Sequence, residues 1–277
     1  MEPRPEGLHL SVQQTLFWVT WHGRLQRHLN AWHTTPMQSA ITSAEPFRPT
    51  VVDFHRANRG GGLFSELISQ WLGAAFAVAA HRLGLRPTAL SLTNLILGLA
   101  TSVTAVALAG KVAAGQVPAW VVGLVALIGW QVAYSLDCAD GQLARVTDQR
   151  TAAGGRVDVL CDVAAQIALV AALCATAVAQ RPATPAWLIA VFAGTWMVNL
   201  VTAVMQAGPN AASMVTSTSL PVRLAKLVRD YGAVIFVTAV VLTFSPALIL
   251  WVIVTFTAIN GGFLLVSIAF SARASLL

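Results

Sequence analysis

Long runs of apolar residues, separated by short polar segments, dominate the chain from residue 87 onward. A helix needs about 20 predominantly apolar residues to cross the hydrocarbon core of a bilayer. We therefore predict six membrane-spanning helices, with the fifth extended by its neighbours: 87–108, 118–136, 159–179, 186–206, 231–244 and 248–270. Ser245 and Pro246 separate the last two, either as a turn or as a kink.

The first 62 residues form a polar arm that contains five of the six histidines. Within it Trp18, Trp21, Leu25 and Trp32 recur at near-helical spacing. This pattern favours an amphipathic helix that lies in the lipid headgroup layer, and a face for a soluble partner is the alternative. The histidines have no spacing typical of zinc ligands.

Between the arm and the first predicted span, residues 63–85 form an apolar stretch that polar residues interrupt. Its uncharged part, 67–80, is too short to span a bilayer, so we expect an interfacial or partly embedded helix. The predicted fold class is an all-α integral membrane protein, with six transmembrane helices preceded by an interfacial amphipathic helix. Its domains are a cytoplasmic arm, 1–62, and a membrane domain, 63–277.

Composition and charge support a membrane protein. Hydrophobic residues make up 56% of the chain and charged residues 10%, against about 25% charged in an ordinary soluble domain. The net charge of +6 then indicates contact with lipid headgroups rather than with nucleic acid. Of the 17 Lys and Arg residues, only Lys111 and Arg181 fall in loops outside the predicted cytoplasmic side. Both termini are therefore expected in the cytoplasm, with the protein in the plasma (inner) membrane.

Four carboxylates lie at the ends of two predicted spans, where ionisable side chains are costly. Asp137 and Asp140 are spaced i,i+3, and Asp158 and Asp162 are spaced i,i+4, so each pair shares one face of its helix. Ionisable residues at the ends of spans are functional candidates. Carboxylates without His or Cys favour a pair of Mg2+ or Mn2+ ions over zinc. A cation or proton path in a transporter and a silent membrane scaffold are the alternatives.

The acids belong to a longer pattern, Asp-x2-Asp-Gly-x2-Ala-Arg-x8-Gly-x3-Asp-x3-Asp, which residues 137–162 fill without a departure. This pattern resembles the signature of the CDP-alcohol phosphotransferases. The resemblance extends to the six-span plan, to the interfacial helix and to the start of the first span. There the family's Pro-x3-Thr is matched by Pro87 and Ser91, and serine keeps the hydroxyl group.

The resemblance implies a metal-dependent enzyme of phospholipid synthesis. It would transfer a substituted phosphate, such as the phosphatidyl group of CDP-diacylglycerol, to an alcohol and release CMP. The implied metal ligands are Asp137, Asp140, Asp158 and Asp162, and Asp162 is also the implied general base. The implied CDP-binding residues are Ser91, Gly141, Ala144, Arg145 and Gly154. A homodimer is implied by the resemblance alone.

The acceptor alcohol is not defined by this pattern. Arg150, Arg156, Arg223 and Arg229 are candidates for binding the phosphate of a phosphorylated acceptor, such as inositol phosphate or glycerol 3-phosphate. The same residues are also typical of anchors that fix topology against anionic lipid, which leaves an uncharged acceptor open. Trp120, Trp187 and Tyr231 lie near predicted span ends, where we interpret them as interfacial aromatic residues.

Overall fold

The structure is a computed structural model that describes residues 48–58, 62–206 and 230–275. The chain divides into two units, Met1–Arg48 and Pro49–Leu277, and the second carries the elements described below. The predicted amphipathic helix around Trp18 and the candidates Arg223 and Arg229 lie outside the described residues. Within the described part of the chain every regular element is a helix and none is a strand, as predicted.

The elements follow one another with short connections. In chain order they are α2 (Val51–Arg56), the π-helical turn η1 (Ser65–Ser69), α3 (Gln70–Arg82), α4 (Pro87–Ala113), α5 (Ala119–Val146), α6 (Ala152–Gln180), α7 (Ala186–Gln206), α9 (Tyr231–Phe244), the 3-10 turn η2 (Pro246–Leu248) and α10 (Ile249–Ser275).

Local sequence signals explain where these helices start and stop. Pro87 is the first residue of α4, where its missing N–H leaves no bond unmade. Gly84 has a φ of 66°, a left-handed conformation that glycine adopts without strain, and it ends the turn after α3. Ser245 and Pro246 form a turn rather than a kink, because α9 ends at Phe244 and η2 follows.

Two helices extend into the polar segment between the second and third predicted spans. Helix α5 continues to Val146 rather than ending near residue 136, and α6 begins at Ala152 rather than near residue 159. Hydropathy ends a predicted span at its first carboxylates, whereas backbone hydrogen bonding continues through them. The carboxylates consequently lie inside regular helix, which fixes the direction of each side chain.

Among the described residues, four helices are long and apolar enough to cross a membrane: Pro87–Ala113, Ala119–Val146, Ala152–Gln180 and Pro246–Ala269. Two shorter apolar helices are Ala186–Val198 and Tyr231–Phe244. Large apolar side chains such as Ile96 and Ile128 point outward, 69% and 57% exposed. Such surfaces suit lipid and are unfavourable in water. The chain is therefore an integral membrane protein, and the count of six spans stays a prediction.

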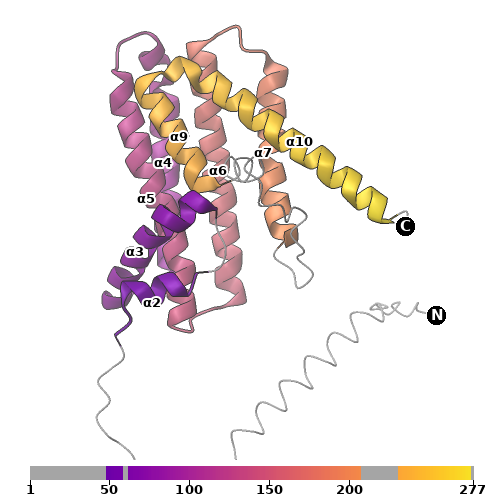
Figure 1. Ribbon diagram of the computed structural model, residues 1–277. Helices are drawn as coiled ribbons and strands as arrows, with labels where there is room; N and C mark the ends of the chain where they lie inside the picture. The colour runs from indigo at the N-terminus through magenta and orange to yellow at the C-terminus, as the bar shows by residue number, and fades with distance from the viewer. Residues whose placement is uncertain (1–47, 59–61, 207–229, 276–277) are drawn as a thin grey trace, which may run out of the picture. The chain divides into compact units, whose positions relative to one another are not determined.

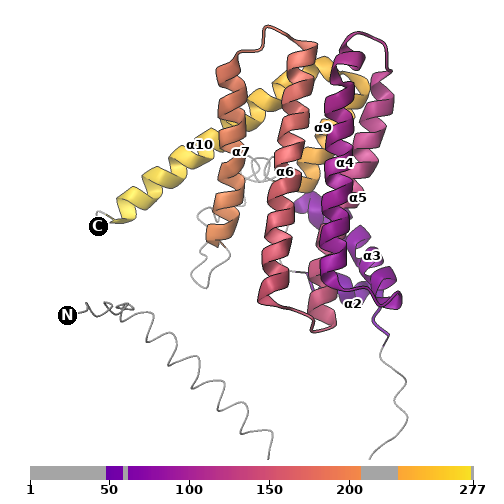
Figure 2. The same ribbon diagram turned by 180° about the vertical axis from the view of Figure 1, so that it is seen from behind.

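Helix α4 packs against both α5 and α6, and α9 packs against α5 (Figure 1). Helix α10 contacts α7 and then leads away from α4–α6, as the view from behind also shows (Figure 2). Helices α4 and α5 approach closely because Gly129 has no side chain. A Cβ atom there would lie 2.1 Å from the Thr101 hydroxyl oxygen. The main core contains Leu169, Phe192 and Ile235.

A second, smaller core joins α2 and α3 to the end of α5. Phe54 of α2, Ala74 of α3 and Leu143 of α5 are fully buried in it. In both views α2 and α3 lie at the end of the helices where α5 turns into α6 (Figures 1 and 2). This end carries the four carboxylates, so the small core supports the candidate site.

Candidate active site

The four aspartates of the sequence pattern meet between α5 and α6. Asp137 and Asp140 project from α5, and Asp158 and Asp162 project from α6. Carboxylate oxygens of Asp137, Asp158 and Asp162 lie within 4.8 Å of one another. Asp137 interacts directly with Asp162, and Asp140 interacts with Asp158, so each acid of α5 faces an acid of α6. The helical spacing predicted this pairing of faces.

Helix α4 supplies the polar neighbours of the two α5 acids. The Ser91 hydroxyl donates a hydrogen bond to Oδ2 of Asp140. Nδ2 of Asn94 lies 3.4 Å from Oδ1 of Asp137. Both side chains are almost fully buried, so they fix the two carboxylates from one side. Oδ1 of Asp158, by contrast, is buried and has no hydrogen-bond partner among the described residues.

This donor set suits hard divalent cations. Several carboxylates in so small a volume repel one another unless positive charge is present. Carboxylate oxygens are the ligands that Mg2+ and Mn2+ prefer. The orphaned, buried oxygen of Asp158 is an atom that a cation would satisfy. On these grounds the residues fit a divalent metal site, although one acid, Asp140, is held by Ser91 and lies outside the tightest group.

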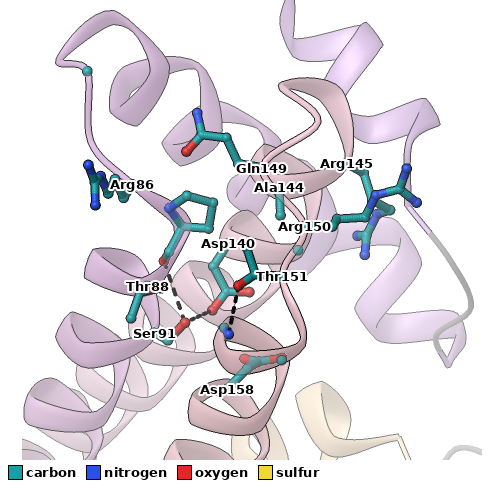
Figure 3. Close-up of a pocket in the computed structure, with 15 residues that line it drawn as sticks. Arg86, Thr88, Ser91, Asp140, Ala144, Arg145, Gln149, Arg150, Thr151 and Asp158 are labelled. Atoms are coloured by element: carbon teal, nitrogen blue, oxygen red, sulfur yellow. Dashed lines mark hydrogen bonds between the residues drawn. The ribbon is translucent and has the colours of Figure 1, made fainter.

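A pocket of about 780 Å3 opens beside the acids, between the ends of α4, α5 and α6. Figure 3 shows Ser91 and Asp140 facing each other at its centre, with Asp158 nearby and Arg145 and Arg150 to one side. All five residues that the resemblance implied for CDP binding line it: Ser91, Gly141, Ala144, Arg145 and Gly154. The N-terminal turn of α6 also lines the pocket, and such turns attract anions.

Arg145 is held in place by a residue that does not belong to the sequence pattern. Its Nε donates to the carbonyl oxygen of Ala57, at the C-terminal end of α2, over 2.6 Å. The guanidinium group also lies over Gly141, where a Cβ atom would approach Nη1 to 2.9 Å. Glycine at this position therefore leaves room for the arginine to reach across the pocket wall.

Helix α2, which positions this carbonyl, begins with a capping box. The Thr50 hydroxyl accepts from the Asp53 N–H, and the Asp53 carboxylate accepts from the Thr50 N–H over 2.8 Å. The hydrogen bonds from the Thr50 hydroxyl and N–H hold the pKa of Asp53 below its usual range. In the sequence these residues fall within the polar arm, and no pattern there predicts a role for them.

Two of the four candidate acceptor arginines, Arg150 and Arg156, lie within the described residues, and one of these two lines the large pocket. Arg150 lines the large pocket, where it forms an exposed ion pair of 3.5 Å with Asp148. Arg156 is exposed on α6 and is not among the described residues that line that pocket. Arg223 and Arg229 lie outside the described residues.

A second cavity, of about 90 Å3, lies beside Asp137 and Asp162. Its other polar residues are Asn94 of α4, Tyr134 of α5, Gln166 of α6 and Tyr231 of α9. None of these residues was predicted as a site residue from the sequence, and Tyr231 was interpreted as interfacial. Polar side chains within apolar runs, Asn94 and Gln166 above all, were the available signal.

Comparison with known families gives one assignment. The family model described as CDP-alcohol phosphatidyltransferase matches residues 84–259. The matched segment contains all four aspartates, both cavities and helices α4 to α9. No curated protein matches the chain.

Proposed function

The chain belongs to the CDP-alcohol phosphatidyltransferase family, and from this premise we propose that it transfers a phosphatidyl group from CDP-diacylglycerol to an alcohol, releasing CMP. The observation that carries the proposal is the junction of the acid cluster with the large pocket. Asp140 and Asp158 belong both to the cluster and to the pocket lining, and Arg145 of the sequence pattern also lines the pocket. Family membership makes the protein a phosphotransferase, so the transporter alternative is not carried further.

The proposed orientation places this site at the cytoplasmic face of the membrane, with six spans and both termini inside. The connections on either side of α4–α6 differ in charge. Arg86 and Arg150 stand at the pocket end, whereas Lys111 and Arg181 stand at the far ends of α4 and α6. Across the sequence, most Lys and Arg residues lie in segments predicted to be on the same side as this end. Their excess supports a cytoplasmic position for the pocket.

Two divalent ions, Mg2+ or Mn2+, would be held by Asp137, Asp140, Asp158 and Asp162. The family depends generally on divalent metal, and the chemistry of the donor set agrees with it. When bound, such ions neutralise the diphosphate and the charge that develops on the leaving phosphate. A homodimer stays a prediction.

The chain's own residues would bind the donor and move one proton. Arg145 and the N-terminal turn of α6 would hold the diphosphate, while Gly141, Ala144, Gly154 and Ser91 shape the pocket around CDP. The acceptor hydroxyl oxygen forms a bond to the β-phosphorus. The bond from that phosphorus to the bridging oxygen breaks, and CMP leaves with the electron pair. Asp162 would take the hydroxyl proton as general base.

The large pocket opens at the ends of α4, α5 and α6, the end that we place at the headgroup level. A lipid donor would arrive laterally from the bilayer and a water-soluble acceptor from the cytoplasm. Arg150, exposed at this pocket, is the described residue best placed to meet the phosphate of an acceptor such as inositol phosphate or glycerol 3-phosphate. Arg156, Arg223 and Arg229 remain further candidates.

The test is CMP release by the purified full-length protein. It is supplied with CDP-diacylglycerol, Mg2+ or Mn2+, and one of five acceptors: inositol phosphate, glycerol 3-phosphate, inositol, serine or phosphatidylglycerol. We expect CMP release that depends on one acceptor and is lost in Asp158→Asn. Glu66→Gln, at an exposed position that lines neither cavity, is the matched control and should keep full activity. If neither CMP release nor binding of CDP-diacylglycerol is detected, the proposal is wrong.

A further inference from the structure

The acid cluster is divided between two cavities that share no lining residue among the described parts of the chain. Asp140 and Asp158 face the large pocket, whereas Asp137 and Asp162 face the cavity of about 90 Å3. A transfer between two substrates needs one on each side of the phosphorus that is attacked, in line with the leaving group. With the nucleotide in the large pocket, the small cavity is the space left on the opposite side of the acids.

Gln166 is the polar residue of this cavity with the best-defined orientation. It lies four residues after Asp162 on α6, so both side chains share one face of the helix. Nε1 of Trp196 donates to Oε1 of Gln166 over 3.0 Å. Because the carbonyl oxygen is engaged from this side, the amide N–H groups are what Gln166 can offer to the cavity.

Trp196 is itself tightly packed, so it holds the Gln166 side chain in one orientation. Only 3% of its surface is exposed, and its ring stacks on Phe256 with centroids 4.6 Å apart. The edge of the same ring system meets Tyr231, another residue of the cavity wall, at a centroid distance of 6.5 Å. The amide of Gln166 is therefore held by packed aromatic residues of α7, α9 and α10 and does not depend on a bound ligand.

Asn94 is oriented in the opposite sense on the facing wall. Its amide nitrogen is directed to Asp137, which leaves its carbonyl oxygen for the cavity. The cavity thus presents a donor from α6, an acceptor from α4 and a carboxylate from Asp162. A hydroxyl group both donates and accepts hydrogen bonds, so this set matches an alcohol.

We propose that this cavity receives the hydroxyl-bearing part of the acceptor, and that Gln166, oriented by Trp196, is a specificity-determining residue that donates a hydrogen bond to an acceptor oxygen. The inference rests on the proposed function. The small volume suits a compact polar group such as a primary or secondary alcohol carbon with its neighbours. A phosphate on the acceptor would have to extend out of this cavity toward Arg150, which lines the large pocket. The attacking hydroxyl then lies beside Asp162, to which its proton passes as the new P–O bond forms.

The test separates acceptor binding from donor binding by steady-state kinetics. CMP release by the purified full-length protein is measured in Mn2+ with the five acceptors named above, varying first the acceptor and then CDP-diacylglycerol. In Gln166→Leu the KM for the acceptor should rise about tenfold, while the KM for CDP-diacylglycerol stays within about twofold. Trp196→Phe, which removes the N–H donor together with part of the indole and keeps an aromatic ring, should shift the acceptor KM in the same direction by less.

Thr176→Val is the matched control on α6. Its hydroxyl bonds to Ala172 within the helix and is buried away from both cavities, so both KM values should remain unchanged. If Gln166→Leu does not fold, Gln166→Met keeps the length of the side chain without adding charge and removes the amide donor, with the same expected KM split. An unchanged acceptor KM in an active variant overturns this inference alone. Wild-type protein that neither releases CMP with any acceptor nor binds CDP-diacylglycerol overturns the proposed function, and the inference with it.

Discussion

Ser65 donates both its backbone N–H and its hydroxyl to the carboxylate of Asp230, a residue 165 positions further along the chain. The same carboxylate accepts from the Phe64 N–H over 2.8 Å and from the Gly232 N–H over 3.1 Å. Asp230 is the N-cap of α9, so one buried side chain joins the start of α9 to η1. The Ser65 hydroxyl also lies 2.9 Å from the hydroxyl of Tyr134, in the wall of the small cavity.

Replacing Asp230 should therefore weaken the contact between η1 and the start of α9. Asp230→Ala removes the N-cap of α9 and leaves two N–H groups of residues 64 and 65 buried without a partner. We expect the free energy of unfolding to fall by about 3 kcal/mol. Denaturant unfolding in detergent micelles, followed by tryptophan fluorescence, measures it. Asp148→Asn is the control and should change stability little, because the Asp148 side chain is 90% exposed and asparagine tolerates its φ of 54°. Equal stability of the two variants would contradict the structural role of Asp230.

Ser91 should matter through Asp140 rather than through its own chemistry. In Ser91→Ala the carboxylate of Asp140 loses the hydroxyl that donates to it, so its orientation toward the pocket is less defined. We expect kcat/KM for CDP-diacylglycerol to fall about tenfold. Ser91→Thr, which restores the hydroxyl of the family pattern, should stay within about threefold of the wild type. CMP release measures both, and a threonine variant as weak as the alanine variant would contradict this account.

Metal binding should stabilise the protein as well as activate it. At a Mn2+ concentration about 100 times its Kd, binding to the folded state adds about 2.7 kcal/mol to stability. We therefore expect Tm to rise on addition of Mn2+ to chelator-treated protein and to return after excess chelator. Asp158→Asn removes the carboxylate with the orphaned buried oxygen, so its Tm should respond weakly. A full Tm response in this variant would place the metal elsewhere.

Much of the site could be predicted from the sequence because helical spacing is a local property. Asp137 with Asp140, and Asp158 with Asp162, share faces in any regular helix, and a short connection brings the two helices together. The hydrogen bonds that orient these acids come from α4, and sequence spacing carries no information about which α4 residue lies opposite. Pro87 and Ser91 were available only through the resemblance.

The residues around the small cavity could not be predicted for the same reason. Gln166 obtains its orientation from Trp196, 30 residues further along the chain and on another helix. Tyr231 stands at the first turn of α9, and a position at a span end is typical of interfacial aromatic residues. Only the packing of α9 against α5 turns it toward Asp137 and Asp162. Tertiary contacts of this kind decide its role.

The capping box of α2 should make part of the stability depend on pH. The pKa of Asp53 is lowered in the folded state by Thr50, so the ionised carboxylate favours folding. This contribution is fully present above the unfolded pKa of about 3.9 and is lost as pH falls through the lower folded pKa. The Tm difference between wild type and Asp53→Ala should accordingly be constant above about pH 5 and shrink below about pH 4. A difference that grows on acidification would contradict this sign.

Replacing Asp162 tests whether this residue acts as the general base or mainly as a metal ligand. It lies with Asp137 in the small cavity, where we place the acceptor hydroxyl, yet its oxygen also belongs to the group of three within 4.8 Å. Asp162→Asn keeps the shape and one neutral oxygen ligand and removes the base, so kcat should fall by about 10²–10⁴-fold. Mn2+ binding, measured by electron paramagnetic resonance, should be retained with a moderately raised Kd. Asp158→Asn is the matched comparison and should lose binding and activity together. Loss of Mn2+ binding in both variants would show that Asp162 is an essential metal ligand, and the fall in kcat would then be explained by the missing metal.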